Sequence, residues 1–154
     1  MKIQIVSRLV QLRLLAVMAT AFGVGAAHGQ SLSNPVRVNI PFEFKVADKK
    51  FPAGEYSVSR AQPTSGDSLL LVSRVDGNGN AFRLTSGVWT STPKESDTLV
   101  FHQYDDQYFL YQVWAAGANV GRELLESRSE REARAGGTDK VAKVRTVSVT
   151  ASAQ

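Results

Sequence analysis

The feature that most constrains this chain is a stretch of alternating apolar and polar residues near its start. Residues 36–46 read V-R-V-N-I-P-F-E-F-K-V, with an apolar side chain at every second position. Side chains of a β-strand point alternately to opposite faces, so the pattern predicts a strand with one face in a core and the other in water. Pro41 cannot donate a backbone hydrogen bond, so we expect this strand to lie at a sheet edge or to bend there.

The first 29 residues have the features of a secretory signal peptide. Three basic residues and no acidic residue accompany an apolar run over residues 14–27, and the small residues Ala27 and Gly29 suit cleavage before Gln30. The run is shorter than the roughly 20 apolar residues of a membrane-spanning helix. We therefore predict that residues 1–29 are a cleaved export signal and that the protein is periplasmic or extracellular.

Removal of this segment changes the charge of the protein. Three of the 18 basic residues and none of the 14 acidic residues lie in it, which leaves 15 basic and 14 acidic residues and a net charge of +1. A near-neutral chain lacks the surplus of Lys and Arg that binding to nucleic acid or an anionic membrane needs. Residues 30–154 suffice for a single β-rich domain, with no cysteine for a disulfide and no expected transmembrane segment.

Further short strands, separated by turn residues, follow the first one. We predict a strand over residues 55–60 and a hairpin that pairs residues 68–75 with residues 80–90. Phe82 and Leu84 alternate with polar residues along the second strand of that hairpin.

Residues 98–114 form the most aromatic stretch, T-L-V-F-H-Q-Y-D-D-Q-Y-F-L-Y-Q-V-W. A two-residue Asp-Asp turn would place Phe101 opposite Leu110. The next pair along the hairpin would then be His102 and Phe109, and both faces would carry large apolar groups. We therefore predict that this hairpin lies mid-sheet, with one side in the main core and the other under a loop, a helix or a neighbouring molecule.

The C-terminal part of the chain contains the only expected helix. Residues 122–135 are good helix formers that end at a glycine pair. Opposite charges four residues apart would pair along this helix: Arg122–Glu126, Arg128–Glu132 and Glu130–Arg134. Residues 140–150 alternate weakly and favour a last edge strand over a disordered tail. The expected fold is mainly β: an antiparallel β-sandwich or partly open barrel of roughly six to seven strands with one C-terminal helix.

Groups that carry out catalysis are scarce in residues 30–154. His102 is the only histidine there and cysteine is absent, so a zinc site lacks its usual ligands. Residues 76–80 begin like a calcium loop, but Ala81 and Gly87 replace the glycine and the glutamate that such a loop requires, so they are read as a turn. No nucleophile elbow or phosphate-binding glycine loop occurs. We predict a non-enzymatic protein with no metal, no cofactor and no catalytic residue.

Aromatic side chains are the remaining candidates for a binding site: Trp89, Tyr104, Tyr108, Tyr111 and Trp114. Rings of this kind form stacking platforms for sugars and hot spots for protein partners. Sheets also bury aromatic side chains, so packing in the core is the competing and commoner role.

Several separated motifs stand out along the chain: N-I-P-F-E-F at residues 39–44, F-P-A-G-E-Y at 51–56, L-V-F-H at 99–102, Y-F-L at 108–110 and G-R-E-L at 121–124. With these motifs the chain resembles a family of small exported bacterial proteins of unknown function. The likeness spans about residues 38–134 and implies a predominantly β domain behind a signal peptide. It implies no activity, ligand or catalytic residue, and it gives His102 no chemical role.

Three functional hypotheses follow from these observations. The first is a non-enzymatic envelope or secreted protein that binds a protein partner or a glycan through the aromatic hairpin over residues 98–114. The alternative is a β-barrel carrier that encloses a small apolar ligand. The third is a hydrolase that uses His102 with a distant Asp or Glu.

Overall fold

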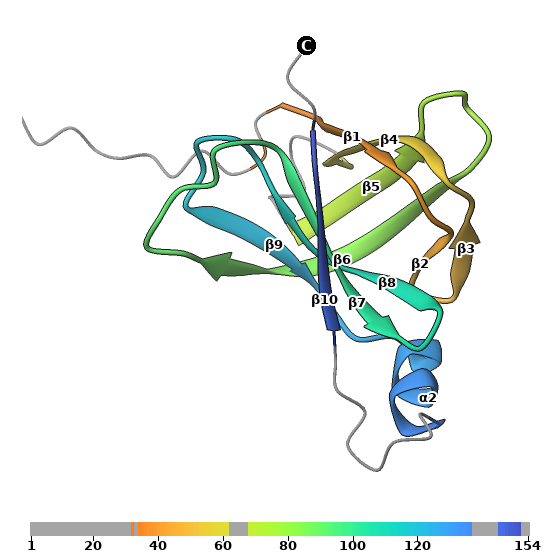
Figure 1. Ribbon diagram of the computed structural model, residues 1–154. Coiled ribbons are helices and arrows are strands. Elements are labelled where there is room, and N and C mark those ends of the chain that lie inside the picture. The colour runs from red at the N-terminus through yellow and green to blue at the C-terminus, as the bar shows by residue number, and fades with distance from the viewer. Residues whose placement is uncertain (1–31, 33, 62–67, 137–144, 152–154) are drawn as a thin grey trace, which may run out of the picture.

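The computed structural model describes residues 32, 34–61, 68–136 and 145–151 (Figure 1). The predicted signal peptide lies outside these residues. Within them the chain is mainly β with a helix near the C-terminus, as predicted, and no helix is long and apolar enough to cross a bilayer. The elements are β1 (Val36–Ile40), β2 (Phe44–Val46), β3 (Lys49–Phe51), β4 (Gly54–Arg60), β5 (Leu69–Arg74), β6 (Asn80–Trp89), β7 (Thr98–Tyr104), β8 (Gln107–Trp114), β9 (Val120–Leu124), α2 (Arg128–Gly136) and β10 (Arg145–Thr150).

The ten strands of the described residues belong to one mixed sheet that does not close into a barrel. The order is β1-β4-β5-β6-β9-β8-β2-β3, and β7 pairs with both β8 and β10. Strand β6 joins the two halves of the sheet, because residues 80–84 pair with β5 and residues 85–89 pair with β9. The sheet is mixed rather than antiparallel throughout, because β2 runs parallel to β8.

The strand count exceeds the expected six or seven partly because the first predicted strand divides in two. Residues 36–40 form β1, which pairs with β4, whereas residues 44–46 form β2, which pairs with β3 and β8. The division falls at Pro41, which cannot donate to a ladder, so the chain leaves one half of the sheet there and enters the other. Residues 49–51 form an additional short strand, β3.

Aromatic rings fill the core where the two halves of the sheet meet. The Phe44 ring stacks on Phe51 at 5.5 Å between centroids and meets Tyr56 edge-on at 4.9 Å and Phe101 edge-on at 5.5 Å. All four side chains are at most 2 % exposed. The Tyr56 hydroxyl donates a 2.6 Å hydrogen bond to the Pro52 carbonyl, so its burial leaves no polar atom unpaired.

The aromatic hairpin has the predicted register. Phe101 lies opposite Leu110 and His102 opposite Phe109, and the turn places Asp105 in the left-handed region at a φ of 49°. Strand β8 also pairs with β9 and β2, so the hairpin lies mid-sheet as expected. Phe101 and Leu110 belong to the main core, whereas His102 contacts α2.

The helix begins later than the sequence predicted. Residues 120–124 form β9, which pairs with β6 and β8, so backbone pairing on both sides overrides the helix propensity of this segment. Ser127 then caps α2, because its Oγ accepts a 3.1 Å hydrogen bond from the Glu130 amide. The predicted pair Arg128–Glu132 forms at 2.8 Å, but Arg134 pairs with Glu126 instead of Glu130.

The outer surface of the sheet keeps some apolar side chains. Phe82 and Leu84 alternate as the sequence indicated, but they face outward and are 56 % and 61 % exposed. They lie opposite Leu71 and Leu69, whereas the inward positions of β5 are Leu70 and Val72. Alternation therefore identified the strand but could not say which of its faces is buried.

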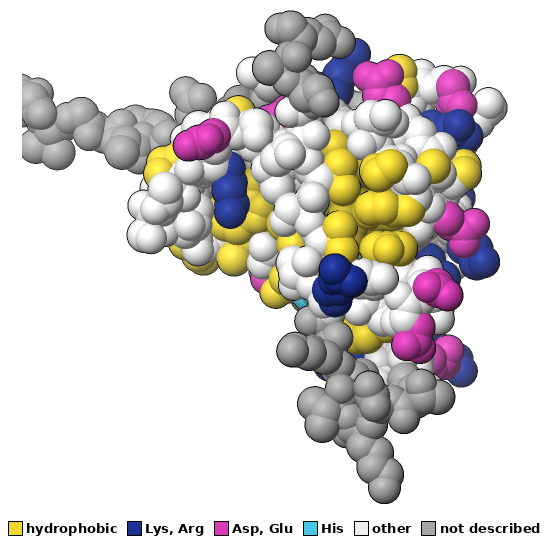
Figure 2. Space-filling view, viewed as in Figure 1, with side chains coloured by type: hydrophobic (Ala, Val, Ile, Leu, Met, Phe, Trp, Pro, Cys, Tyr) yellow, Lys and Arg dark blue, Asp and Glu magenta, His cyan; other side chains and the backbone are white. Residues whose placement is uncertain are grey.

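The sheet stays open between β1 and β10. Strand β10 pairs only with β7 among the described strands, and β1 pairs only with β4. Val149 and Ala151 pack against the core at this seam. Figure 2 shows hydrophobic side chains gathered on the visible face beside β10, with charged side chains along the neighbouring rim.

Candidate functional site

A cleft of about 400 Å³ lies on the side of the β7–β8 hairpin that faces the helix. Figure 1 shows α2 beside the turn end of this hairpin. Three strands and the helix segment line the cleft: His102 and Tyr104 of β7, Tyr111 of β8, Glu123 and Leu124 of β9, Leu125 and Glu126 of the connection, and Glu130 and Arg134 of α2.

Regular spacing brings these side chains together. His102 and Tyr104 are two residues apart on β7 and therefore share a face of that strand. Glu130 and Arg134 are four residues apart and share a face of α2. The cleft thus has a strand wall that carries the rings and Glu123, and a helix wall that carries Glu130 and Arg134.

The centre of the cleft is an imidazole held by a buried carboxylate. His102 Nδ1 lies 2.8 Å from Glu130 Oε1, and Glu130 is 6 % exposed. The His102 ring stacks on Tyr111 with the centroids 3.8 Å apart and the planes 24° apart, and it meets the Tyr104 ring edge-on. Contacts on several sides therefore fix the orientation of the imidazole.

The tyrosine hydroxyls sit in an environment that favours their neutral forms. Burial raises the pKa of Tyr104 to about 12, and the nearby carboxylates of Glu130 and Glu126 act in the same direction. Burial also raises the pKa of Tyr111, and its hydrogen bond to Glu123 adds to this effect. Both tyrosines consequently remain hydrogen-bond donors at neutral pH.

Every carboxylate of the cleft has a partner. Glu123 accepts a 2.9 Å hydrogen bond from Gln112, Glu126 lies 3.2 Å from Arg134, and Glu130 contacts His102. The lining contains three carboxylates and one guanidinium, but no serine, threonine, cysteine or lysine. It therefore offers hydrogen-bond acceptors and aromatic surface, but no aliphatic hydroxyl, thiol or amine group.

The turn between β2 and β3 positions the helix wall. The Ser129 amide donates a 3.1 Å hydrogen bond to Asp48 Oδ1, and the Ser129 hydroxyl donates a 3.0 Å bond to the Ala47 carbonyl. These bonds hold the first turn of α2, from which Glu130 reaches the cleft. The hydrogen bonds from Ser129 also lower the pKa of Asp48.

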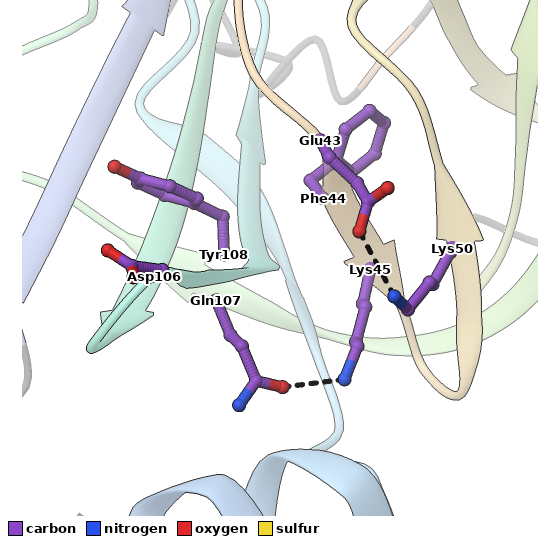
Figure 3. Close-up of a pocket in the computed structure, with 7 residues that line it drawn as sticks. All are labelled: Glu43, Phe44, Lys45, Lys50, Asp106, Gln107 and Tyr108. Atoms are coloured by element: carbon purple, nitrogen blue, oxygen red, sulfur yellow. Dashed lines mark hydrogen bonds and ion pairs between the residues drawn. The ribbon is translucent and has the colours of Figure 1, made fainter.

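A second, smaller hollow of about 110 Å³ lies where β2 and β3 meet the tip of the aromatic hairpin (Figure 3). Lys45 donates a 2.7 Å hydrogen bond to Gln107 Oε1, and Lys50 lies 3.3 Å from Glu43 Oε1. Tyr108 also lines this hollow, and its ring stacks on Phe42 with the centroids 4.1 Å apart. The hollow is several times smaller than the cleft, so the cleft is the better candidate site.

The five aromatic residues singled out from the sequence do not form one platform. Tyr104 and Tyr111 line the cleft, and Tyr108 lines the other hollow. Trp114 is 4 % exposed, with its Nε1 donating a 3.1 Å hydrogen bond to Gln112 Oε1. Trp89 is 73 % exposed at the end of β6.

The acidic wall of the cleft was missed by sequence reasoning. The sequence predicted Glu126 and Glu130 as partners of Arg122 and Arg134 in ion pairs along the helix. A local signal was present in S-R-S-E at residues 127–130, because Ser followed three residues later by Glu is typical of a helix start. No local pattern could connect Glu130 with His102, which lies 28 residues earlier in the chain.

No family model, curated protein or solved structure matches this chain. Within the described ranges, no group of three or more His, Asp or Glu residues is arranged to hold a metal ion. Function is therefore inferred from the geometry of the cleft.

Proposed function

We propose that this protein is a non-enzymatic, exported binding domain and that its cleft receives a sugar unit of a glycan. The observation that carries the proposal is the meeting of aromatic rings from β7 and β8 with three carboxylates from β9 and the helix segment. Sugars present hydroxyl donors around rings with apolar faces, so they match acceptors placed beside aromatic surface. The volume of about 400 Å³ lies within the usual range of small-molecule sites.

The charge of the cleft indicates which classes of sugar it can bind. Three glutamates and one arginine line it, so its carboxylates outnumber its basic side chains. Neutral sugars and amino sugars can approach such a surface, whereas uronic acids and sialic acids would meet like charges. We therefore expect neutral or amino sugars to bind and acidic sugars to be rejected.

The packed interior favours a surface site over the carrier hypothesis. A carrier needs a hollow interior, but the rings of Phe44, Phe51 and Tyr56 pack against one another where the two halves of the sheet meet. A ligand would have to displace these rings, at the expense of the core. The surface cleft requires no such rearrangement.

Titration of the purified protein with a panel of neutral, amino and acidic oligosaccharides tests the proposal. We expect saturable binding of a neutral or amino sugar by calorimetry, and Tyr111→Ala should weaken it by roughly tenfold or more because it removes a stacking surface. Trp89→Ala is the matched control, because Trp89 is an exposed aromatic residue outside the cleft. Failure of the whole panel to bind, or equal losses in the two variants, would contradict the proposal.

The His102–Glu130 pair supports one second candidate, a hydrolase. A carboxylate that holds one ring nitrogen of a histidine can orient the other nitrogen as a general base toward a bound water. Hydrolysis of model ester and glycoside substrates measures this directly. Turnover that His102→Ala abolishes would favour the hydrolase, whereas turnover that survives this substitution would exclude His102 as the base.

A further inference from the structure

The helix wall of the cleft is docked without an apolar anchor. Residues 128–136 read R-S-E-R-E-A-R-A-G, so alanine is the largest apolar side chain in α2. The only buried residue of the helix is Glu130, which is ionisable. Helices of soluble proteins usually dock by burying an apolar stripe, so α2 lacks the ordinary source of docking strength.

Polar contacts hold this helix against the sheet. Glu130 contacts His102, and Ser129 bonds to Asp48 and to the Ala47 carbonyl. Water can replace each of these partners when the helix moves away. Hydration of the Glu130 carboxylate also offsets the loss of its contact with His102, because burial of a charged group carries a large desolvation penalty.

We propose that α2 is a latched lid of the cleft, closed by the Glu130–His102 and Ser129–Asp48 contacts and opened to admit a ligand while the sheet stays folded. This inference rests on the proposed function, because it concerns access to the same cleft. The pivot is the connection at residues 125–127, which follows the last residue of β9. Opening moves Glu130 and Arg134 away from the ring wall formed by His102, Tyr104 and Tyr111.

Hydrogen exchange of backbone amides in the purified protein tests the lid without any ligand. We expect the amides of α2 to exchange roughly 100-fold faster than those at the centres of β7 and β8, since a nine-residue helix released from the sheet is too short to stay folded in water. If α2 and these strands exchange at the same rate, the helix opens only by global unfolding and the lid is excluded.

Two glutamate substitutions in α2 test whether the Glu130–His102 contact holds the helix closed. Glu130→Ala removes the contact with His102, and we expect it to accelerate exchange of α2 roughly tenfold or more and to leave the strands unchanged. Glu132→Ala is the matched control, because Glu132 is exposed and, among the described residues, its ion pair runs along the helix to Arg128. Equal acceleration by both substitutions would overturn the latch.

A second variant keeps the test informative if Glu130→Ala fails to fold. Asp48→Ala removes the acceptor of the Ser129 amide at an exposed turn, and it should accelerate exchange of α2 in the same way. Unchanged exchange in this variant would count against the proposed closure. Hydrogen exchange requires no sugar, so it tests the lid independently of the oligosaccharide titration. The lid can therefore be excluded without excluding glycan binding, and glycan binding without excluding the lid.

Discussion

The two faces of the β7–β8 hairpin differ in how they are packed, although they alternate residue by residue along the same strands. Phe101 is fully buried in the main core, where its ring meets Phe42 and Phe44 edge-on. The next residue, His102, lies on the opposite side, where it stacks on Tyr111 and pairs with Glu130. One face therefore lies in the main core, whereas the other combines buried rings such as Phe109 with a polar cleft under the helix.

Substitution of Phe101 and of its neighbour His102 tests most directly whether the two faces of the hairpin contribute differently to stability. We expect Phe101→Ala to lower the free energy of unfolding by about 3–5 kcal/mol, because it leaves a cavity among packed rings. His102→Ala should cost much less, because α2 can release Glu130 to water. Urea denaturation followed by tryptophan fluorescence measures both values. Equal losses would show that the helix face is as much a part of the core as the other face.

The contrast between the faces also explains which features could be predicted from the sequence. The register of Phe101 with Leu110 depends on a local turn and on strand parity, and it was predicted correctly. The start of α2 was wrong, because β6 and β8 recruit residues 120–124 as a strand, and partners distant in sequence determine that outcome.

The cleft itself could be predicted only in part. Tyr104 and Tyr111 were identified as candidates because they are aromatic, and both line the cleft. Glu130 was read as a solvated helix residue, because its burial depends on α2 folding back onto β7. Similarly, Phe82 matches the pattern of an inward residue but faces outward, since alternation does not specify the buried face.

The pKa of Tyr104 makes the helix face sensitive to alkaline pH. Burial raises this pKa to about 12, above the ordinary value near 10, so the folded state favours the neutral phenol. This preference contributes about 2–3 kcal/mol to the free energy of unfolding. The contribution is present in full below about pH 10 and is lost as the pH rises to about 12.

Tyr104→Phe should reduce this alkaline loss, because phenylalanine cannot ionise. Urea unfolding of both proteins at pH 9, 10 and 11 gives the comparison. The two curves of stability against pH should diverge as the pH rises through about 10, where the tyrosine of the unfolded chain is half ionised. Parallel curves would mean that the Tyr104 hydroxyl ionises as readily in the folded protein as in the unfolded chain.

A substitution beneath Trp114, at the far end of the hairpin, is expected to lower the free energy of unfolding by a smaller amount. A Cβ at Gly121 of β9 would lie 2.6 Å from the Trp114 ring, so this ring requires a glycine beneath it. We expect Gly121→Ala to cost about 1–3 kcal/mol, because a buried indole cannot shift without disturbing its neighbours. Gly136→Ala is the control, since a Cβ there meets nothing within 4 Å and should change stability by less than about 0.5 kcal/mol. Near-equal stabilities of the two variants would show that Trp114 can move, and that tight packing is confined to the core beside Phe101.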